Sequence, residues 1–382
     1  MVIQNGTVFC PDGVFRKMDV STHGPLVAAL DPVLPAPEEA PLNADNCYVV
    51  PGFVDIHIHG AMGADFSDGN PQATHTIAAF LLRHGVTSFL GTSLALPEDA
   101  LQTAYRTAHP LVDKYLPGQA VLLGINMEGP FFSQTQRGAQ NEKYIVPPDF
   151  ELFERLQLAS NGNIRTVAVA PETEDALSFI EKASRVCTVS LAHSNAGYAL
   201  ALEAFARGAC HVTHLFNGMA PFTHHDTGIV GAAADSGAYV ELISDGKHVQ
   251  PSMVRAVFKL FGTHRVCLIS DAMRACGRPE GRYTLGGLPV IVKDGAATIA
   301  SGSLAGSVTV LSDCVRNAVS FGVPLESALL AATRNPAASV GLQNSVGSIQ
   351  PGLHADLLVL NKELGLEHIL LGGQLQARAL FS

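Results

Sequence analysis

Three side chains that could do chemistry recur at every second position of the segment GFVDIHIHG, residues 52–60. They are Asp55, His57 and His59, and apolar residues alternate with them. Residues two apart along a β-strand share one face, so the segment predicts a buried strand that aims a carboxylate and two imidazoles in one direction. Neutral imidazole is a common ligand of Zn²⁺ and similar ions. Two histidines in this pattern, followed at once by Gly60, favour a metal site over satisfied core histidines.

The elements that must position these residues follow a regular pattern. After Pro51, short β-branched runs alternate with helix-like stretches such as PQATHTIAAFLLRHG and AGYALALEAFARGA, which is typical of βα units around a parallel sheet. The eight candidate strands are FVDIHIH, VTSFLGTSL, AVLLGINME, IRTVAVAPE, TVSLAHS, HVTHLFN, YVELISD and VCLISDA. Eight such units predict an α/β fold of the (β/α)8 TIM-type barrel class.

Both ends of the chain differ from this pattern. They contain short apolar pieces separated by turns such as NGT and PDG. We therefore predict that residues 1–50 and 346–382 pair to form a small β-sandwich. Residues 51–345 are the predicted metal-dependent (β/α)8 barrel, which carries the catalytic site.

Ligand-type residues end five of the predicted strands, where the chemistry of such barrels lies. These residues are His57 and His59 on the first strand, Glu128 on the third, His193 on the fifth, His214 on the sixth and Asp271 on the eighth. Each alone has a structural explanation, such as a helix cap or a core histidine. Together they predict a mono- or binuclear metal centre at the barrel mouth.

A divalent cation in such a site polarises a carbonyl and lowers the pKa of bound water, so that hydroxide forms near neutral pH. Hydrolysis of an amide also needs a proton donor for the leaving amine. Asp271 is the predicted general base and acid, because a carboxylate beside the water can take its proton and pass it on. We predict one or two ions per chain, Zn²⁺ first, with Fe²⁺, Mn²⁺ or Co²⁺ as alternatives.

The composition argues against several other classes of protein. The 382 residues are 47% hydrophobic, carry a net charge of −10 and show no Lys/Arg cluster, which disfavours nucleic-acid and anionic-membrane partners. The seven cysteines are scattered and lack CxxC spacing, as is typical of reduced thiols. The sequence shows neither a secretion signal nor an apolar run long enough to span a bilayer, so we expect a cytoplasmic location.

A set of motifs in a fixed order then identifies a family. The motifs PGFVDIHIHG, MEGPFF, AHSNA, THLFNGM, SDGKHV, SDAM, LAGS and PGLHADLLVL run from about Pro51 to Leu360. They resemble those of the N-acetylglucosamine-6-phosphate deacetylases of the amidohydrolase superfamily. The resemblance implies removal of acetate from an N-acetyl amino-sugar 6-phosphate, with N-acetyl-D-glucosamine 6-phosphate preferred. It also implies a homodimer.

The resemblance implies a role for individual residues as well. Glu128, His193 and His214 match the ligands of the metal that family members always hold. His57 and His59 match a pair that some members keep for a second metal, and Asp271 matches the general base and acid. The implied substrate contacts are Ala139, Asn217, Gly218, His225, His248, Leu304, Ala305 and Gly306.

Two positions depart from the family pattern. Gln140 stands in RGAQN where the family usually has His, and His225 stands in HHDTG where the family usually has an Arg that holds the phosphate. A guanidinium binds phosphate through two bonds and is always charged, whereas an imidazole offers one donor and titrates near neutral pH. His224, Arg137 or Arg282 could assist a phosphate, or the substrate could lack one.

Several alternatives stay open at this point. Segments such as SDAMRACGRPEGRYTLGG are also similar to N-acetylgalactosamine-6-phosphate deacetylases, so the sugar epimer is open, and an unphosphorylated N-acetyl hexosamine is a further candidate. A dihydroorotase- or dipeptidase-like hydrolase is disfavoured, because strand four ends in AVAPE without the lysine that many of those enzymes carboxylate. A non-catalytic sugar-phosphate sensor is disfavoured because the predicted ligands and Asp271 are all present.

Overall fold

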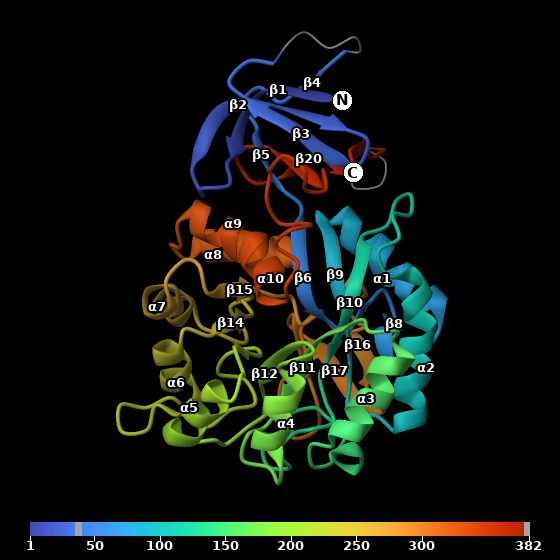
Figure 1. Cartoon of the computed structure of the whole chain (residues 1–382), viewed down its shortest axis with the longest axis vertical. Coiled ribbons are helices and arrows are strands. Elements are labelled where there is room, and N and C mark those ends of the chain that lie inside the picture. The colour runs from blue at the N-terminus through green and yellow to red at the C-terminus, as the bar shows by residue number, and fades with distance from the viewer. Residues whose placement is uncertain (35–39, 378–382) are drawn as a thin grey trace.

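The computed structural model describes residues 1–34 and 40–377. Eight parallel strands follow one another around a barrel in chain order (Figure 1). The strands are β6 Phe53–Ile58, β9 Val86–Ser93, β10 Val121–Met127, β11 Ile164–Val169, β12 Thr188–Leu191, β13 His211–Val212, β14 Tyr239–Leu242 and β15 Val266–Leu268. A parallel bridge between Ile58 and Ala272 joins the last unit to the first. The predicted barrel and its eight strands are confirmed.

Several barrel strands end earlier than predicted. The backbone just after β12, β13 and β15 turns into the left-handed region, with φ of 45° at His193, 25° at His214 and 48° at Asp271. Residues other than glycine rarely adopt this conformation, and it cannot continue a strand. Three of the predicted site residues therefore lie in sharp turns just beyond the strands.

Ten α-helices are described, and those that follow barrel strands cover the outside of the barrel (Figure 1). They are α1 Pro71–Arg83, α2 Glu98–Ala108, α3 Phe150–Ala159, α4 Ala176–Ala183, α5 Tyr198–Ala206, α6 Gly228–Ser236, α7 Pro251–Phe261, α8 Leu311–Ser320, α9 Leu325–Ala332 and α10 Arg334–Ser339. The helix predicted from PQATHTIAAFLLRHG is α1, whose N-cap Asn70 accepts a hydrogen bond from the Ala73 N–H, and the one from AGYALALEAFARGA is α5.

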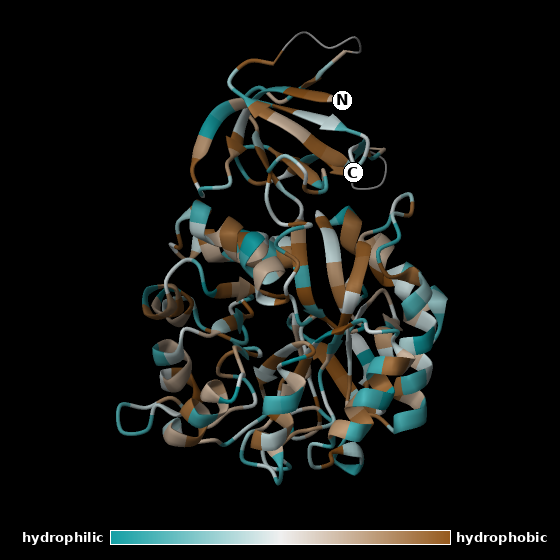
Figure 2. Cartoon of the chain, viewed as in Figure 1, coloured by the Kyte–Doolittle hydropathy of each residue, from teal (hydrophilic) through white to brown (hydrophobic). Residues whose placement is uncertain are grey.

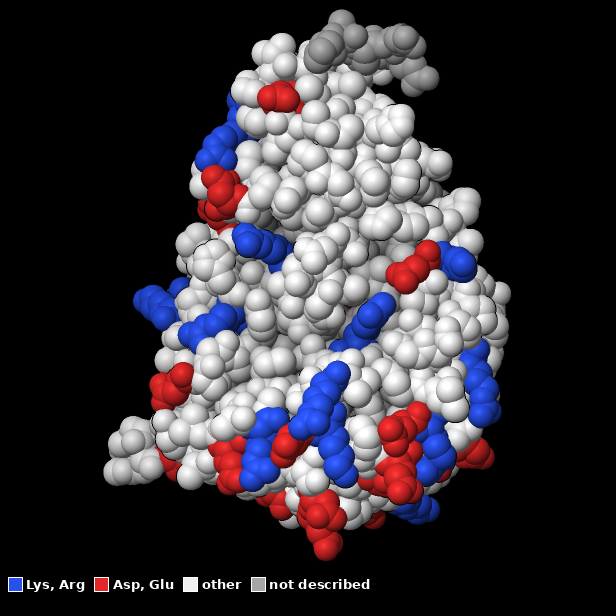
Figure 3. All heavy atoms as spheres, viewed as in Figure 1, with Lys and Arg blue, Asp and Glu red and all other residues white. Residues whose placement is uncertain are grey.

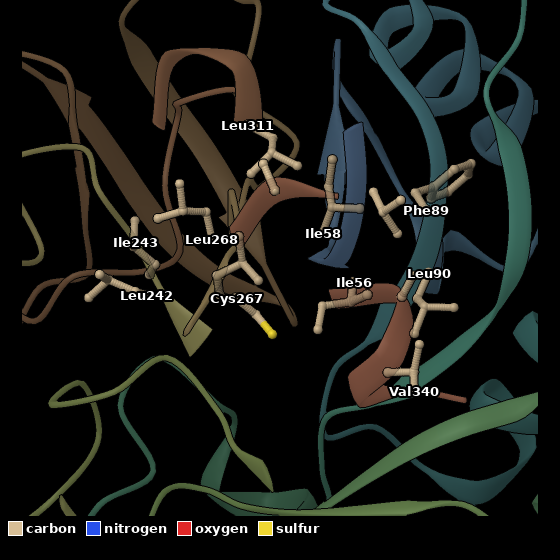
Figure 4. Close-up of a cluster of buried hydrophobic side chains, with 14 of the residues drawn as sticks. Ile56, Ile58, Phe89, Leu90, Leu242, Ile243, Cys267, Leu268, Leu311 and Val340 are labelled. Carbon is tan, nitrogen blue, oxygen red and sulfur yellow. The ribbon is translucent and has the colours of Figure 1, made fainter. Parts of the chain in front are cut away.

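The main core lies between the barrel strands and these helices. Ile56 and Ile58 of β6 join Phe89 and Leu90 of β9 and Leu311 of α8 in one buried cluster (Figure 4). Figure 2 shows largely apolar barrel strands and hydrophilic outer helix faces. The apolar residues of β6 thus anchor the strand, while the alternating polar residues face the opposite way.

The two ends of the chain build one mixed sheet above the barrel (Figure 1). Its strands are β1 Val2–Phe9, β2 Phe15–His23, β3 Leu26–Asp31, β4 Leu42–Asn43, β5 Tyr48–Pro51, β19 Leu357–Leu360, β20 Leu366–Leu371 and β21 Gln374–Leu375. Antiparallel β5 and β19 join the N- and C-terminal halves. The Val27 N–H donates to the Leu353 carbonyl, so β3 returns to the segment before β19 and the sheet folds over its own core. The predicted β unit from both termini is confirmed.

A three-stranded antiparallel sheet follows β15 and was not predicted. It consists of β16 Gly281–Leu285, β17 Leu288–Lys293 and β18 Ala296–Thr298. Its buried residues Leu285, Val290 and Val292 share a cluster with Leu94 and Met273, which lie near the carboxyl ends of the barrel strands. The small elements β7 Gly60–Ala61, β8 Ala64–Asp65, η1 Phe66–Asp68, η2 His109–Leu111 and η3 Glu142–Tyr144 complete the described part of the chain.

The surface agrees with the composition. Lysine and arginine are interspersed with acidic residues over the face shown in Figure 3. Within residues 1–34 and 40–377, no helix has the length and apolar character needed to cross a membrane.

Candidate active site

Glu128, which directly follows β10, lies at the centre of the predicted metal site. Its Oε1 atom lies 3.0 Å from His214 Nε2 and 3.3 Å from His193 Nε2. Its Oε2 atom lies 3.3 Å from His59 Nε2. These residues and His57 form two buried groups that share Glu128, and within each group the possible ligand atoms lie within 4.8 Å of one another. The structure therefore brings together ligand-type residues from four strands.

The outer ring nitrogen of each histidine faces a group that can only accept a hydrogen bond. The Nδ1 atoms of His59, His193 and His214 lie 3.3, 2.8 and 3.0 Å from the carbonyl oxygens of Thr92, Gln136 and Asn217. His57 Nδ1 lies 2.9 Å from Glu241 Oε2. We infer that Nδ1 carries the proton in the neutral form of each ring, because a carbonyl or carboxylate oxygen supplies none. All four Nε2 lone pairs then face the centre.

The donor set fits a divalent cation. His57 Nε2 is buried and has no hydrogen-bond partner among the described residues. It lies 3.6 Å from Glu128 Oε1 and 3.5 Å from Asp271 Oδ1. The separations of 3.0 to 3.3 Å around Glu128 are close to the roughly 3.3 Å expected between ligands of a tetrahedral Zn²⁺. Converging lone pairs of this kind are stabilised by a shared cation.

Asp271 faces the same centre. Its Oδ1 atom lies 3.3 Å from His59 Nε2, and its backbone N–H donates to the His57 carbonyl at 2.9 Å. The Ser307 N–H donates to the Asp271 carbonyl at 2.6 Å. These bonds hold Asp271 in a left-handed conformation that costs on the order of 1–3 kcal/mol and is found mostly at functional sites.

The electrostatics favour a cation as well. Burial alone raises the pKa of Glu128 and of Asp271, but the neighbouring imidazoles, His57 above all, hold both below their usual range. Burial alone lowers the pKa of His57, yet Glu241, Glu128 and Asp271 raise it to about 9. The carboxylates thus keep their negative charge and attract positive charge to the imidazoles.

A cavity of about 950 Å³ opens over this cluster. His59, Glu128, His193, His214 and Asp271 line it. The predicted substrate contacts that line the cavity are Ala139, Asn217, Gly218, His248, Leu304 and Gly306. Ala305 is fully buried and lies outside the lining, and His225 lies on an exposed loop that the cavity of its own chain does not include.

Gln140 lies between the metal cluster and the rim of the cavity. Its Nε2 donates to Glu128 Oε2 at 2.8 Å, and its Oε1 accepts from the Ala95 N–H at 2.8 Å. The side-chain amide is buried and therefore fixed in one orientation. Gln140 therefore holds the Glu128 carboxylate in place.

Two carboxylates of the site were missed by the sequence analysis. Glu241 of β14 contacts His57, and Asp245 Oδ2 lies 2.7 Å from His248 Nδ1. The hydrogen bond from His248 lowers the pKa of Asp245 against the effect of its burial. A signal existed for Glu241, because a carboxylate within the apolar run YVELI is rarely buried without a partner.

The chain is similar to known proteins over most of its length. The model of the Amidohydrolase family matches residues 48–377. The chain is 33% identical over 383 aligned positions to the N-acetylglucosamine-6-phosphate deacetylase of Lysinibacillus sphaericus, covering 99% of this chain and 98% of the relative. It is 35% identical to the N-acetylgalactosamine-6-phosphate deacetylase of Escherichia coli O157:H7, over 92% of each chain.

A solved structure matches the whole fold. It is a mutant N-acetyl-D-glucosamine-6-phosphate deacetylase from Mycobacterium smegmatis in complex with N-acetyl-D-glucosamine-6-phosphate, with a TM-score of 0.91, 31% identity and 98% coverage of both chains. The chain therefore belongs to the amidohydrolase family, which is metal-dependent. The relatives named here are, within that family, deacetylases of amino-sugar 6-phosphates.

Proposed function

We propose that the protein hydrolyses N-acetyl-D-glucosamine 6-phosphate to D-glucosamine 6-phosphate and acetate. The observation that carries this proposal is the buried convergence of four imidazole nitrogens and two carboxylates beneath a cavity. Near full-length similarity to deacetylases of amino-sugar phosphates supports the same reaction. N-acetyl-D-galactosamine 6-phosphate is the second candidate substrate, because one relative with 35% sequence identity is named as its deacetylase.

We assign the metal ligands to two sites that share one carboxylate. Glu128, His193 and His214 would hold one cation, and His57, His59 and Glu128 would hold a second, with Asp271 beside it. Zn²⁺ is our first choice for an imidazole and carboxylate site. When bound there, a divalent cation polarises the acetamide carbonyl and lowers the pKa of water.

The residues of the chain supply the proton transfers and the orientation. Asp271 takes a proton from the attacking water and gives it to the leaving nitrogen, which must be protonated to depart as an amine. Gln140 keeps the Glu128 carboxylate in place. Asp245 fixes the proton of His248 on Nδ1, so that Nε2 is left as an acceptor for a sugar hydroxyl.

A kinetic screen tests the proposal. Acetate release is measured with N-acetylglucosamine and N-acetylgalactosamine, each with and without a 6-phosphate. We expect the highest kcat/KM for N-acetylglucosamine 6-phosphate. A higher value for either unphosphorylated sugar would overturn the phosphate assignment. Binding of all four sugars without acetate release would support a sensor instead.

We also propose a homodimer in which His225 contacts the substrate of the partner subunit. Loop residues 221–226 are exposed, Phe222 among them at 40%, and His225 lies outside the cavity of its own chain. Mixing the variants His225→Ala and Asp271→Asn tests this arrangement. If His225 acts across the interface, mixed dimers regain a site with both residues and a low KM. If it acts within its own chain, or not at all, mixing restores nothing.

Two further assignments stay proposals. The division into a β unit of residues 1–50 and 346–382 and a barrel of residues 51–345 is supported by the separate core of the terminal sheet. A cytoplasmic location is supported by the cysteines, all seven of which are free thiols, as expected in a reducing compartment.

A further inference from the structure

Glu241 is a fully buried carboxylate in β14 to which the proposed reaction assigns no role. Its exposed fraction is 0%, so the carboxylate has no access to bulk water. Such a group persists only where specific partners compensate the loss of hydration. Its partners therefore indicate what it does.

One oxygen of Glu241 contacts residues of both groups of candidate metal ligands. Oε2 lies 2.9 Å from His57 Nδ1 and accepts from the His214 backbone N–H at 3.1 Å. Oε1 has no hydrogen-bond partner among the described residues and lies 3.9 Å from His211 Nδ1. The hydrogen bonds of the carboxylate are thus concentrated on a ligand of one group and on the backbone of a ligand of the other.

His57 differs from the other three histidines in the kind of group that holds it. The Nδ1 atoms of His59, His193 and His214 are hydrogen-bonded to backbone carbonyls, which no side-chain replacement removes. Of the four, only His57 has a side chain, that of Glu241, as the partner of its Nδ1. A carboxylate at this place fixes the tautomer and the ring orientation and makes the ligand more basic.

We propose that Glu241 is a positioning residue that sets the affinity of the cation held by His57, His59 and Glu128. It does so by keeping the proton of His57 on Nδ1 and its Nε2 lone pair directed at the cation. The cation held by Glu128, His193 and His214 depends on it much less, because Glu241 touches only the backbone of His214. This inference rests on the proposed two-cation centre.

Two variants separate the contributions of Glu241. In Glu241→Gln the amide oxygen can still accept from His57 and from the His214 N–H, but the charge is lost. In Glu241→Leu both the charge and the acceptor are lost. Asp245→Asn is the matched control, because it alters a second buried carboxylate–histidine pair, at the end of the same strand, that holds no metal ligand.

The measurement is a titration of metal-depleted protein with Zn²⁺ in competition with a chromophoric chelator, which resolves a first and a second equivalent. We expect Glu241→Gln to weaken the second equivalent about tenfold and Glu241→Leu about a hundredfold, with the first changed less than about threefold. Asp245→Asn should change neither. Thermal unfolding of each variant reports whether it folds, and the Gln variant, which is isosteric, carries the test if the Leu variant does not.

A readout of the tautomer distinguishes positioning from a merely structural role. The readout uses metal-depleted protein with ¹⁵N-labelled histidine at a pH above the raised pKa of His57, where the ring is neutral and its tautomer is defined. The ring signals missing from His57→Asn identify His57. We expect Nδ1 protonation in the wild type and a mixture of tautomers in Glu241→Leu. Equal weakening of both equivalents, or no weakening of the second, would overturn the inference alone. A wild-type protein that binds a single equivalent would overturn it together with the two-cation centre.

Discussion

The two ends of the barrel bury aspartates in opposite ways. At the carboxyl ends of the strands, Asp271 lies among imidazoles, which hold its pKa below the usual range against the effect of burial. At the amino ends, Asp356 lies between the barrel and the terminal sheet, where burial raises its pKa. Asp356 accepts hydrogen bonds from the Tyr115 hydroxyl at 2.9 Å and from the Gly372 N–H at 2.7 Å.

The backbone differs between the two ends as well. His193, His214 and Asp271 all have a positive φ at the carboxyl ends of the strands, and strained backbone of this kind is found mostly at functional sites. Asp356 lies directly before β19 and ties the barrel to the sheet through the Gly52 N–H, which donates to its carbonyl. The carboxyl ends of the barrel strands carry the charged side chains that could do chemistry, whereas the amino ends use a carboxyl group as a structural link.

The largest expected effect belongs to the end of the barrel that carries the proposed active site. Asp271→Asn keeps the shape of the side chain but removes its ability to take a proton. We expect kcat for acetate release to fall by about 10²–10⁴-fold, while substrate still binds. Steady-state kinetics and calorimetric binding check the two halves of this expectation. Turnover near that of the wild type would place the general base elsewhere.

The next effect belongs to the structural end. Tyr115→Phe removes a donor from the buried Asp356, so we expect the free energy of unfolding to fall by about 1–3 kcal/mol while kcat of the folded protein stays unchanged. Tyr198→Phe is the matched control, because it removes the same hydroxyl–carboxylate bond at an exposed pair, Tyr198 and Asp235. Urea unfolding measures both variants. A loss of stability in the control as large as that in Tyr115→Phe would contradict the comparison.

The smallest effect is a dependence of stability on pH. Because the pKa of Asp356 is raised in the folded protein, the folded state binds its proton more tightly than the unfolded chain does. The stability that this contributes is present below the unfolded pKa of about 3.9 and is lost as the pH rises through the folded value. Asp356→Asn should remove this part of the pH dependence, by about 1.4 kcal/mol for each unit of elevation.

Urea unfolding of wild type and Asp356→Asn between pH 4 and pH 8 checks this. The stability of the variant relative to the wild type should rise with pH over this range. A difference in stability between the two proteins that stays constant with pH would show that the pKa of Asp356 is not raised in the folded state. Asn can replace the carboxyl group here, because the Tyr115 hydroxyl can also accept a hydrogen bond.

Much of the fold could be predicted from local patterns. Apolar runs of strand length marked all eight barrel strands, since such runs reflect burial that any parallel barrel requires. The early ends of β12, β13 and β15 could not be predicted, because their turns are held by contacts such as that between Asp271 and His57. The sheet β16–β18 had a signal in the Gly-Gly and Asp-Gly turns that separate its short strands.

The site divides in the same way. The ligand-type residues stood out in sequence because each ends an apolar strand. The partner of His57 did not, because Glu241 is 184 positions away in sequence and meets it only when the barrel closes. The contact of Gln140 with Glu128 and the Ala95 N–H likewise depends on three separate segments. The proposed contact of His225 with the substrate of a partner subunit would depend on how two chains pair, and its exposed loop carries no local pattern for such pairing.

The most direct test measures metal content and acetate release together. Metal-depleted protein receives Zn²⁺ in steps, and bound metal and turnover of N-acetylglucosamine 6-phosphate are recorded at each step. We predict no turnover without metal, full turnover above one bound equivalent per chain, and a lower stoichiometry in the double variant His57→Asn, His59→Asn. A protein that releases no acetate at any loading, or that binds a single equivalent unchanged by the double variant, would contradict the two-cation deacetylase.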